Sequence, residues 1–225
     1  MTDEVKPRRT YRSTKRAEQV AQTRRDILAT AGALFRARSY SGASMPAIAR
    51  EANVAVETIY RAFGNKAGLF QAVVDAAVAG GASRAEMRVE QRPAIRAIIE
   101  EPDPRRQIER YASTQPGIHR RAGPLLRVLS EAAPSDPELT RLWTSIETSR
   151  LNGQAGFVRM LAERGVLRPG LSVEEGSDGL WTLTSLAVWD LLVTARGWSA
   201  ERYERWLADR LIDLLEGVWR MMGPI

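Results

Sequence analysis

Helical spacing of the apolar residues is the feature that most limits the fold of this 225-residue chain. From Val20 onward, apolar residues recur three or four positions apart, which places them on one face of a helix. No segment alternates between apolar and polar residues with a period of two, and no Asn-Gly or Asp-Gly turn separates two apolar runs. The sequence therefore predicts an all-α fold.

Two short helices are expected near the N-terminus, after a longer helix over residues 20–38. Ser44 stands as the N-cap of the first short helix, and Pro46 falls in its first turn, where a missing amide proton costs little. Residues 53–55 form a tight connection to a second short helix over residues 56–62. Two short helices joined by such a turn and packed on a longer one indicate a helix-turn-helix, whose second helix fits the major groove of B-DNA.

The positive charge of the chain is concentrated in its first third. Residues 1–70 carry 13 Lys and Arg against 6 Asp and Glu, a formal charge of +7, whereas residues 71–225 carry 20 against 21. Such a surface releases counterions when it lies along a phosphate backbone, so a nucleic acid is the expected partner, with a solvated basic tail as the alternative. Residues 1–19 lack apolar periodicity, and we expect them to form a flexible basic arm, with or without DNA contact.

The composition disfavours several classes of function. The chain has no cysteine and one histidine, His119, so a thiolate, a catalytic triad or a multi-histidine metal site is not expected. The sequence also has no glycine-rich phosphate loop and no paired carboxylates in an apolar setting, and we expect neither an enzyme nor a cofactor or metal. No uncharged apolar run of eighteen residues occurs, and no apolar segment follows the basic N-terminus. We therefore expect a cytoplasmic protein without membrane contact.

Residues 24–70 resemble the DNA-binding domain of the TetR family. The residues that match the family pattern, at its spacing, are Ala33-Leu34-Phe35, Ser39-Tyr40, Ser44-Met45-Pro46-Ala47-Ile48-Ala49, Ala52-Asn53-Val54, Thr58-Ile59-Tyr60, Phe63, Lys66 and Leu69. Three positions depart from the pattern. Asn53 replaces a glycine in the turn, Ala55 replaces the serine that caps the second short helix, and Ser39 stands where a glycine ends the first helix. The missing cap costs about 1 kcal/mol, while Asn tolerates a left-handed backbone.

The resemblance implies two domains after the arm. The head, residues 20–66, is a helix-turn-helix DNA-binding domain, and the body, residues 67–225, binds an effector and dimerises. By their positions in the family pattern, the residues implied at the DNA are Ser44, Pro46, Val56, Glu57, Thr58, Tyr60 and Lys66. A packing role for Tyr60 and a solvated position for Glu57 are the alternatives.

The expected dimer surface is formed by helices over residues 173–195 and 199–222. The first is apolar around most of its circumference, and the second carries a broad apolar stripe. An ordinary monomer core is the alternative. A homodimer would read two half-sites of an inverted repeat in double-stranded DNA.

Family members usually sense a small molecule between the middle helices. The residues that we expect around an unknown apolar or aromatic effector are Trp143, Ile146, Phe157, Met160 and Trp181, with plain core packing as the alternative for each. We also expect His119 at the surface, near the start of a helix, and helix breaks at prolines that include Pro116.

The sequence thus predicts a ligand-responsive transcriptional regulator, a repressor that binds its operator as a dimer and is released by its effector. The alternative is a helical small-molecule or protein-binding module with a vestigial DNA-binding head.

Overall fold

The computed structural model describes residues 8–216, and every regular element within them is a helix, as predicted. The elements are α1 (Arg8–Gly42), α2 (Met45–Glu51), α3 (Val56–Phe63), α4 (Lys66–Ala79), α5 (Ala82–Ala85), the 3-10 turn η1 (Val89–Gln91), α6 (Pro93–Ile99), α7 (Pro104–Ala132), the 3-10 turn η2 (Ala133–Ser135), α8 (Pro137–Glu163), α9 (Val173–Leu183), α10 (Leu186–Trp189), the π-helix η3 (Asp190–Ala195) and α11 (Ala200–Leu215). Among the helices of this described part, none combines the length and apolar character needed to cross a membrane.

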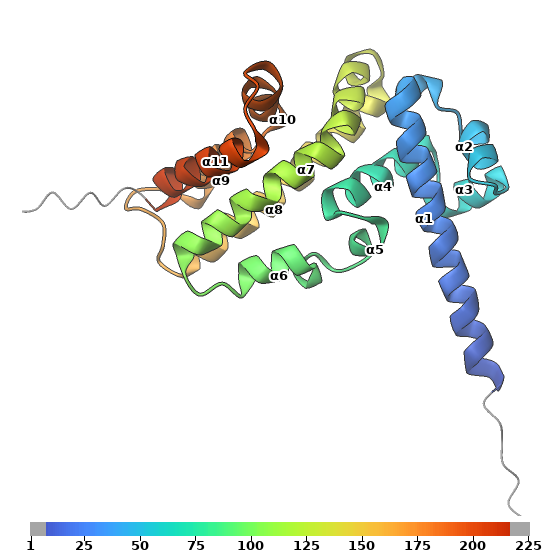
Figure 1. Cartoon of the computed structure of the whole chain (residues 1–225), viewed down its shortest axis with the longest axis horizontal. Helices are drawn as coiled ribbons and strands as arrows, with labels where there is room; N and C mark the ends of the chain where they lie inside the picture. Colours follow the sequence, from blue (N-terminus) through green and yellow to red (C-terminus); the bar gives the residue numbers. More distant parts are fainter. Residues whose placement is uncertain (1–7, 217–225) are drawn as a thin grey trace, which may run out of the picture.

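The molecule is elongated, with α1 to α4 at one end and the long helices α7 and α8 running from there towards α9, α10 and α11 (Figure 1). Its apolar side chains form two cores. The first core joins α1 to α4 with the adjacent ends of α7 and α8, and includes Phe35, Ile59 and Leu129. The second core fills the body between α6, α7, α8, α9 and α11, and includes Leu161 and Tyr203. The head is therefore packed directly on the long body helices.

α1 starts earlier than the sequence indicates. It begins at Arg8, so the predicted flexible arm is wrong for residues 8–19, while residues 1–7 lie outside the described part of the chain. Residues such as Ala17, Glu18 and Gln19 are strong helix formers, and the packed helix behind them supplies the nucleus from which helix can extend. Residues 15–20 are exposed, and this end of α1 projects beyond the rest of the head (Figure 1).

The predicted end of the first helix is confirmed as a sharp break at Ser39. Its backbone has φ 59° and ψ 177°, a region that is open almost only to glycine, so Ser39 is strained. The break turns Tyr40 back onto the head, where its ring centroid lies 5.8 Å from that of Phe35 and 5.4 Å from that of Phe70. These aromatic contacts hold the chain in the strained turn.

α7 does not break at Pro116, which corrects the sequence-based expectation. Asp103 caps the start of α7 by accepting from the amides of Arg105 and Arg106, and the helix then continues through both Pro116 and Pro124. Each proline removes one backbone hydrogen bond, but α7 packs into both cores, and that packing outweighs the loss.

The predicted helix over residues 173–195 is wrong as a single element, because it is divided into α9, α10 and the π-helix η3. The division is at Ser185, whose hydroxyl accepts from the Val188 amide at 3.3 Å and so starts a new helix. The helix predicted over residues 199–222 is present as α11, which is capped by Ser199. Residues 217–222 of that prediction lie outside the described part.

Candidate nucleic-acid interface

α2 and α3 form the predicted helix-turn-helix. Ser44 caps α2, its hydroxyl accepting from the Ala47 amide at 3.3 Å, and Pro46 lies in the first turn. The turn passes through Asn53 with φ 53°, so an asparagine takes the left-handed position that the family pattern gives to glycine. Ile48 of α2 and Ile59 of α3 are completely buried, which fixes the two helices against α1 and α4.

α3 presents a polar outer face. Ala55 has the extended backbone of an N-cap but makes no side-chain cap, as predicted, and its carbonyl accepts from the Thr58 amide at 2.9 Å. Glu57 and Arg61 are exposed, and Tyr60 is 48% exposed, so about half of its side chain is accessible, and its contact with DNA stays a prediction. Val56 and Thr58 are half-buried, so only part of each side chain can reach a ligand.

The capping segment of α2 also lies at the surface. Ser44 and Pro46 are both exposed. The Ser44 oxygen accepts a bond from its own helix, while its hydroxyl hydrogen remains available to a phosphate oxygen.

Lys66 is held by neighbouring groups rather than extended into solvent. Its ammonium lies 4.4 Å from the centroid of the Tyr40 ring and donates to the Ser41 carbonyl at 3.4 Å. Partial burial lowers the pKa of Lys66. This geometry joins the start of α4 to the Ser39 turn, and a phosphate contact by Lys66 stays a prediction.

Several arginines of the head were not singled out by the sequence pattern. Arg24 stacks on Phe63 of α3, 4.4 Å from the ring centroid, and donates to the Ala62 carbonyl at 3.3 Å. Arg61 is exposed on α3 and makes no ion pair with an acidic side chain described by the structure. The position of Arg24 beside α3 follows only from the packing, because α1 and α3 are far apart in sequence. Arg61 lies within the predicted helix over residues 56–62, and the helical spacing could have identified it.

The sequence of the head matches a known protein family. Residues 27–73 match the model of a family described as bacterial regulatory proteins, tetR family. This segment is a TetR-type DNA-binding domain. In the chain it is followed by a body that has the fold of TetR-family regulators. No curated protein sequence matches the chain at a significant level.

Two solved structures illustrate how far the shared fold extends. NalD of Pseudomonas aeruginosa, described as the secondary repressor of the MexAB-OprM multidrug efflux pump, is 21% identical over 89% of this chain and 99% of its own, with a TM-score of 0.68. FadR of Bacillus subtilis, solved with stearoyl-CoA, is 18% identical over 86% of this chain and 98% of its own, with a TM-score of 0.63. At these identities the likeness establishes the fold, in which the TetR-type domain is one part.

The five residues expected around an effector are divided between the two cores. Trp143 and Ile146 pack in the first core, beside the head. Phe157 and Met160 pack in the second core. Trp181 is half-buried, and the guanidinium carbon of Arg150 lies 4.7 Å from the centroid of the Trp181 ring. The structure therefore does not bring the five together, and an effector contact by any of them stays a prediction.

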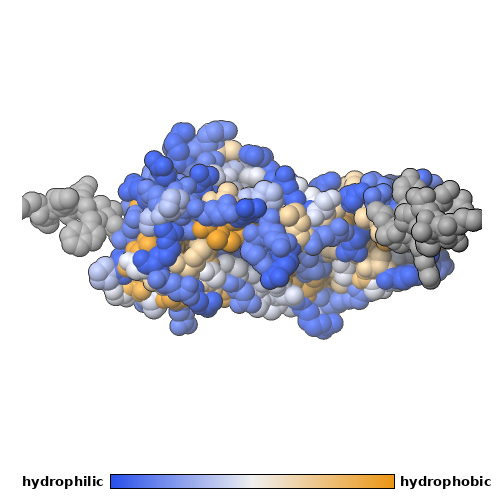
Figure 2. All heavy atoms as spheres, turned by 90° about the horizontal axis from the view of Figure 1, so that it is seen from below, coloured by the Kyte–Doolittle hydropathy of each residue, from blue (hydrophilic) through white to orange (hydrophobic). Residues whose placement is uncertain are grey.

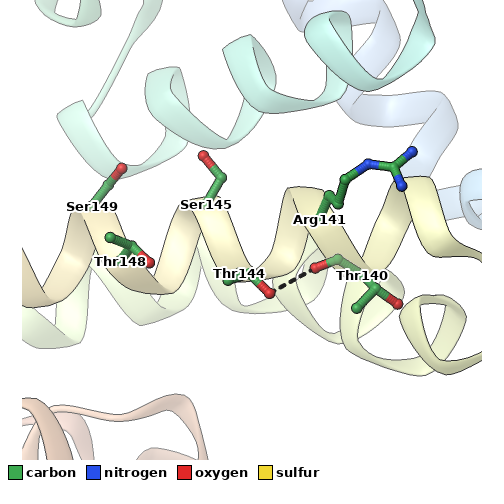
Figure 3. A pocket seen from close by; sticks show the side chains of 6 residues that line it. All are labelled: Thr140, Arg141, Thr144, Ser145, Thr148 and Ser149. Atoms are coloured by element: carbon green, nitrogen blue, oxygen red, sulfur yellow. Dashed lines mark hydrogen bonds between the residues drawn. The ribbon is translucent and has the colours of Figure 1, made fainter.

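A hollow of about 400 Å³ is open on the surface of α8, and none of the five lines it (Figure 3). Its lining comes from α8 alone, and consists of Thr140, Arg141, Thr144, Ser145, Thr148 and Ser149. A depression along one helix encloses little of a ligand, so this surface is a weak candidate for an effector site.

His119 is buried rather than exposed, which corrects the expectation from sequence. It lies within α7, its ring stacked on Trp189 with the centroids 5.0 Å apart. Burial and the Arg150 charge hold the pKa of His119 down at about 4. The expectation failed because it placed a helix start at Pro116, whereas α7 continues through this region.

Proposed function

We propose that the chain is a ligand-responsive transcriptional repressor that binds an inverted-repeat operator as a homodimer. The observation that carries the proposal is the TetR-type domain with an exposed outer face on α3. In this proposal α3 lies in the major groove, and the residues that meet DNA are Ser44, Pro46, Val56, Glu57, Thr58, Tyr60 and Lys66, joined by Arg61. The hydroxyls of Ser44, Thr58 and Tyr60 donate to phosphate oxygens and fix the register, while Val56 and Glu57 are placed to meet base edges.

Dimerisation doubles the number of bases that are read. One α3 contacts too few bases to specify a long site, whereas a twofold dimer presents two such helices. We assign the dimer surface to the helices near residues 173–195 and 199–222, that is, to the region of α9, α10, η3 and α11. In support, Leu191 of η3 is 64% exposed. Figure 2 shows the molecule from below, the side on which α6 lies in Figure 1, and there hydrophobic residues form small groups among hydrophilic ones.

α4 connects the head to the body, and the body helices contact it at both ends. At its C-terminal end, Arg121 of α7 donates to the carbonyls of Ala77 at 2.8 Å and Val78 at 3.5 Å. At its N-cap, the Asn65 amide donates to Glu138 of α8 at 3.3 Å. A shift of α7 on effector binding would therefore move α4 and with it the head.

The effector acts in this proposal by favouring a dimer whose two α3 helices no longer match the spacing of the operator. A coupling free energy of about 1–3 kcal/mol would weaken DNA binding roughly 5- to 150-fold. The structure of FadR in complex with stearoyl-CoA supports the idea that a protein of this fold can bind a small molecule. We expect the effector here to be apolar or aromatic.

The proposal is tested by fluorescence anisotropy with labelled duplexes that tile the DNA on both sides of the gene. We expect one duplex to bind in a salt-sensitive way, and Tyr60→Ala and Arg61→Ala each to weaken that binding at least about tenfold. Arg159→Ala is the matched control, because Arg159 is an exposed arginine on α8 of the body and its loss should leave DNA affinity unchanged. If no duplex is bound at low salt, the chain is instead a helical binding module with a vestigial head.

A further inference from the structure

A cluster of polar and aromatic side chains lies at the centre of the body. We call it the body cluster; its members are Tyr111 and His119 of α7, Arg150 and Gln154 of α8, Thr184 at the end of α9, Trp189 of α10 and Tyr203 of α11. Each of the main body helices thus contributes at least one polar group to one place. Neither the DNA-binding head nor the packing of the second core requires polar atoms there.

Gln154 carries the one buried side-chain oxygen or nitrogen in the described part of the chain that has no hydrogen-bond partner. The side chain is only 4% exposed, and its Nε2 donates to the Thr184 hydroxyl at 2.7 Å. That hydroxyl donates its single hydrogen to the Leu180 carbonyl at 2.8 Å, so towards Gln154 it can only accept. The amide orientation is therefore fixed, and the free atom is the acceptor Oε1.

The charges around the body cluster are already paired. Arg150 donates to the Glu147 carboxylate at 2.8 and 3.2 Å and to the Trp181 carbonyl at 2.8 Å. Arg127 forms a two-pronged ion pair with Asp190, next to the cluster. Because a charge that enters a buried site without a counter-charge is strongly disfavoured, this environment selects a neutral molecule.

The aromatic side chains of the body cluster offer flat faces to such a molecule. Tyr111 stacks on Phe157 with a centroid distance of 4.5 Å, and Trp189 meets Tyr203 edge to face at 4.9 Å. Burial raises the pKa of Tyr111 to about 12, with the nearby Gln154 opposing the rise, so its hydroxyl keeps its proton at neutral pH. The aromatic members of the body cluster are thus uncharged, and their faces can stack on a planar ring.

One of these rings, that of Trp189, belongs to the least regular part of the body. Trp189 ends the four-residue α10 and is followed directly by the π-helix η3, a rare conformation that is frequently found at functional sites. Displacement of α10 and η3 would carry the Trp189 ring away from His119 and Tyr203 and open the body cluster without moving the long helices.

We propose that the body cluster binds a neutral aromatic molecule that carries a hydrogen-bond donor, such as a phenol or an N–H heterocycle, and that the donor pairs with Gln154 Oε1. This inference rests on the proposed function, because it supplies the effector class of that regulator. The connection from this site to the DNA-binding head is short, because α7 carries both His119, which lies in the body cluster, and Arg121, which contacts α4. Both residues lie between Pro116 and Pro124, where α7 lacks two backbone hydrogen bonds.

The test uses three probes of one shape in isothermal titration calorimetry with the purified full chain. These are 2-naphthol, which has a donor, 2-methoxynaphthalene, which has none, and 2-naphthoate, which is anionic. We expect 2-naphthol to bind the wild type at least about tenfold more tightly than either of the others. Equal binding of 2-naphthol and 2-methoxynaphthalene, tighter binding of 2-naphthoate, or no saturable binding of 2-naphthol would overturn the proposal.

Two glutamine variants assign the preference to one atom. Gln154→Met keeps the length of the side chain but removes the acceptor, and it should reduce the preference for 2-naphthol to less than about threefold. Gln107→Met is the matched control, because Gln107 is also buried in the body but both ends of its amide are bonded, to the Ile98 carbonyl at 2.8 Å and to Arg164 at 2.7 Å. It should lower Tm and retain the tenfold preference. A preference that survives in Gln154→Met would overturn the assignment.

Operator binding is measured separately, so that the two proposals can fail independently. Without probe, Gln154→Met should bind the operator as the wild type does, and 2-naphthol should release only the wild type. Selective binding of 2-naphthol by a protein that binds no duplex would refute the repressor and support the binding site.

Discussion

Replacement of Ser39 by glycine should stabilise the protein. The strained backbone of Ser39, with φ 59° and ψ 177°, costs about 1–3 kcal/mol for a residue with a side chain, and Ser39→Gly relieves that cost. Glycine also destabilises the folded state by about 0.5–1 kcal/mol, because the unfolded chain becomes more flexible and loses more conformational entropy on folding. The variant also loses the contact between the Ser39 and Ser41 hydroxyls at 3.3 Å, which is exposed and contributes about 0.5 kcal/mol. The net effect is a gain of about 1 kcal/mol, or a rise in Tm of about 2–4 °C for a chain of this size.

The assay is urea unfolding followed by circular dichroism at one fixed protein concentration, because a dimer would make stability depend on concentration. Ser39→Ala is the control, since alanine loses the same hydroxyl contact but keeps the strained backbone. We expect it to be slightly less stable than the wild type. The reasoning about strain is refuted if Ser39→Gly unfolds at the same urea concentration as Ser39→Ala.

Three further variants test other parts of the structure. Ala55→Ser should stabilise α3 by about 1 kcal/mol in thermal unfolding, because residue 55 has the extended backbone of an N-cap and a serine there can accept from the Thr58 amide; an unchanged Tm would count against that geometry. His119 should make the fold less stable in acid, because its pKa is about 4 in the folded protein and 6.5 in the unfolded chain. As the pH falls, the unfolded state takes up the proton first, so the free energy of unfolding decreases between pH 6.5 and 4. At pH 5 the decrease is about 2 kcal/mol. His119→Gln should lose less stability than the wild type between pH 7 and pH 5 in urea unfolding, and an equal loss would contradict the buried, neutral histidine. Arg121→Ala should lower the unfolding free energy by about 1 kcal/mol, since it removes the donor to the last carbonyls of α4, whereas Arg120→Ala, an exposed neighbour, should not.

The head could be predicted almost residue by residue because its signals are local. Ser44 as a cap, the left-handed Asn53, the uncapped Ala55 and the break at Ser39 each depend on a few neighbouring residues, and the structure has all four. The exception is the start of α1. There the absence of an apolar stripe indicated an arm, but a helix needs no stripe where it extends from an already packed segment.

The body could be predicted only as a set of helices. Pro116 was expected to break a helix, and only the packing of α7 against both cores explains why it does not. The division at Ser185 could have been predicted, because serine is a preferred N-cap residue. The apolar residues on both sides of Ser185 instead indicated one continuous helix. The body cluster depends on residues that are distant in sequence, and the free oxygen of Gln154 follows from hydrogen bonds that no sequence pattern contains.

In the proposed complex, two copies of α3 enter successive major grooves of one DNA site. Hydroxyl-radical footprinting on the bound duplex tests it directly. We expect two protected half-sites related by inverted symmetry, about one helical turn or a whole number of turns apart, and both protections should be lost together in Tyr60→Ala. A single protected half-site, or protection that is unchanged in Tyr60→Ala, would contradict it.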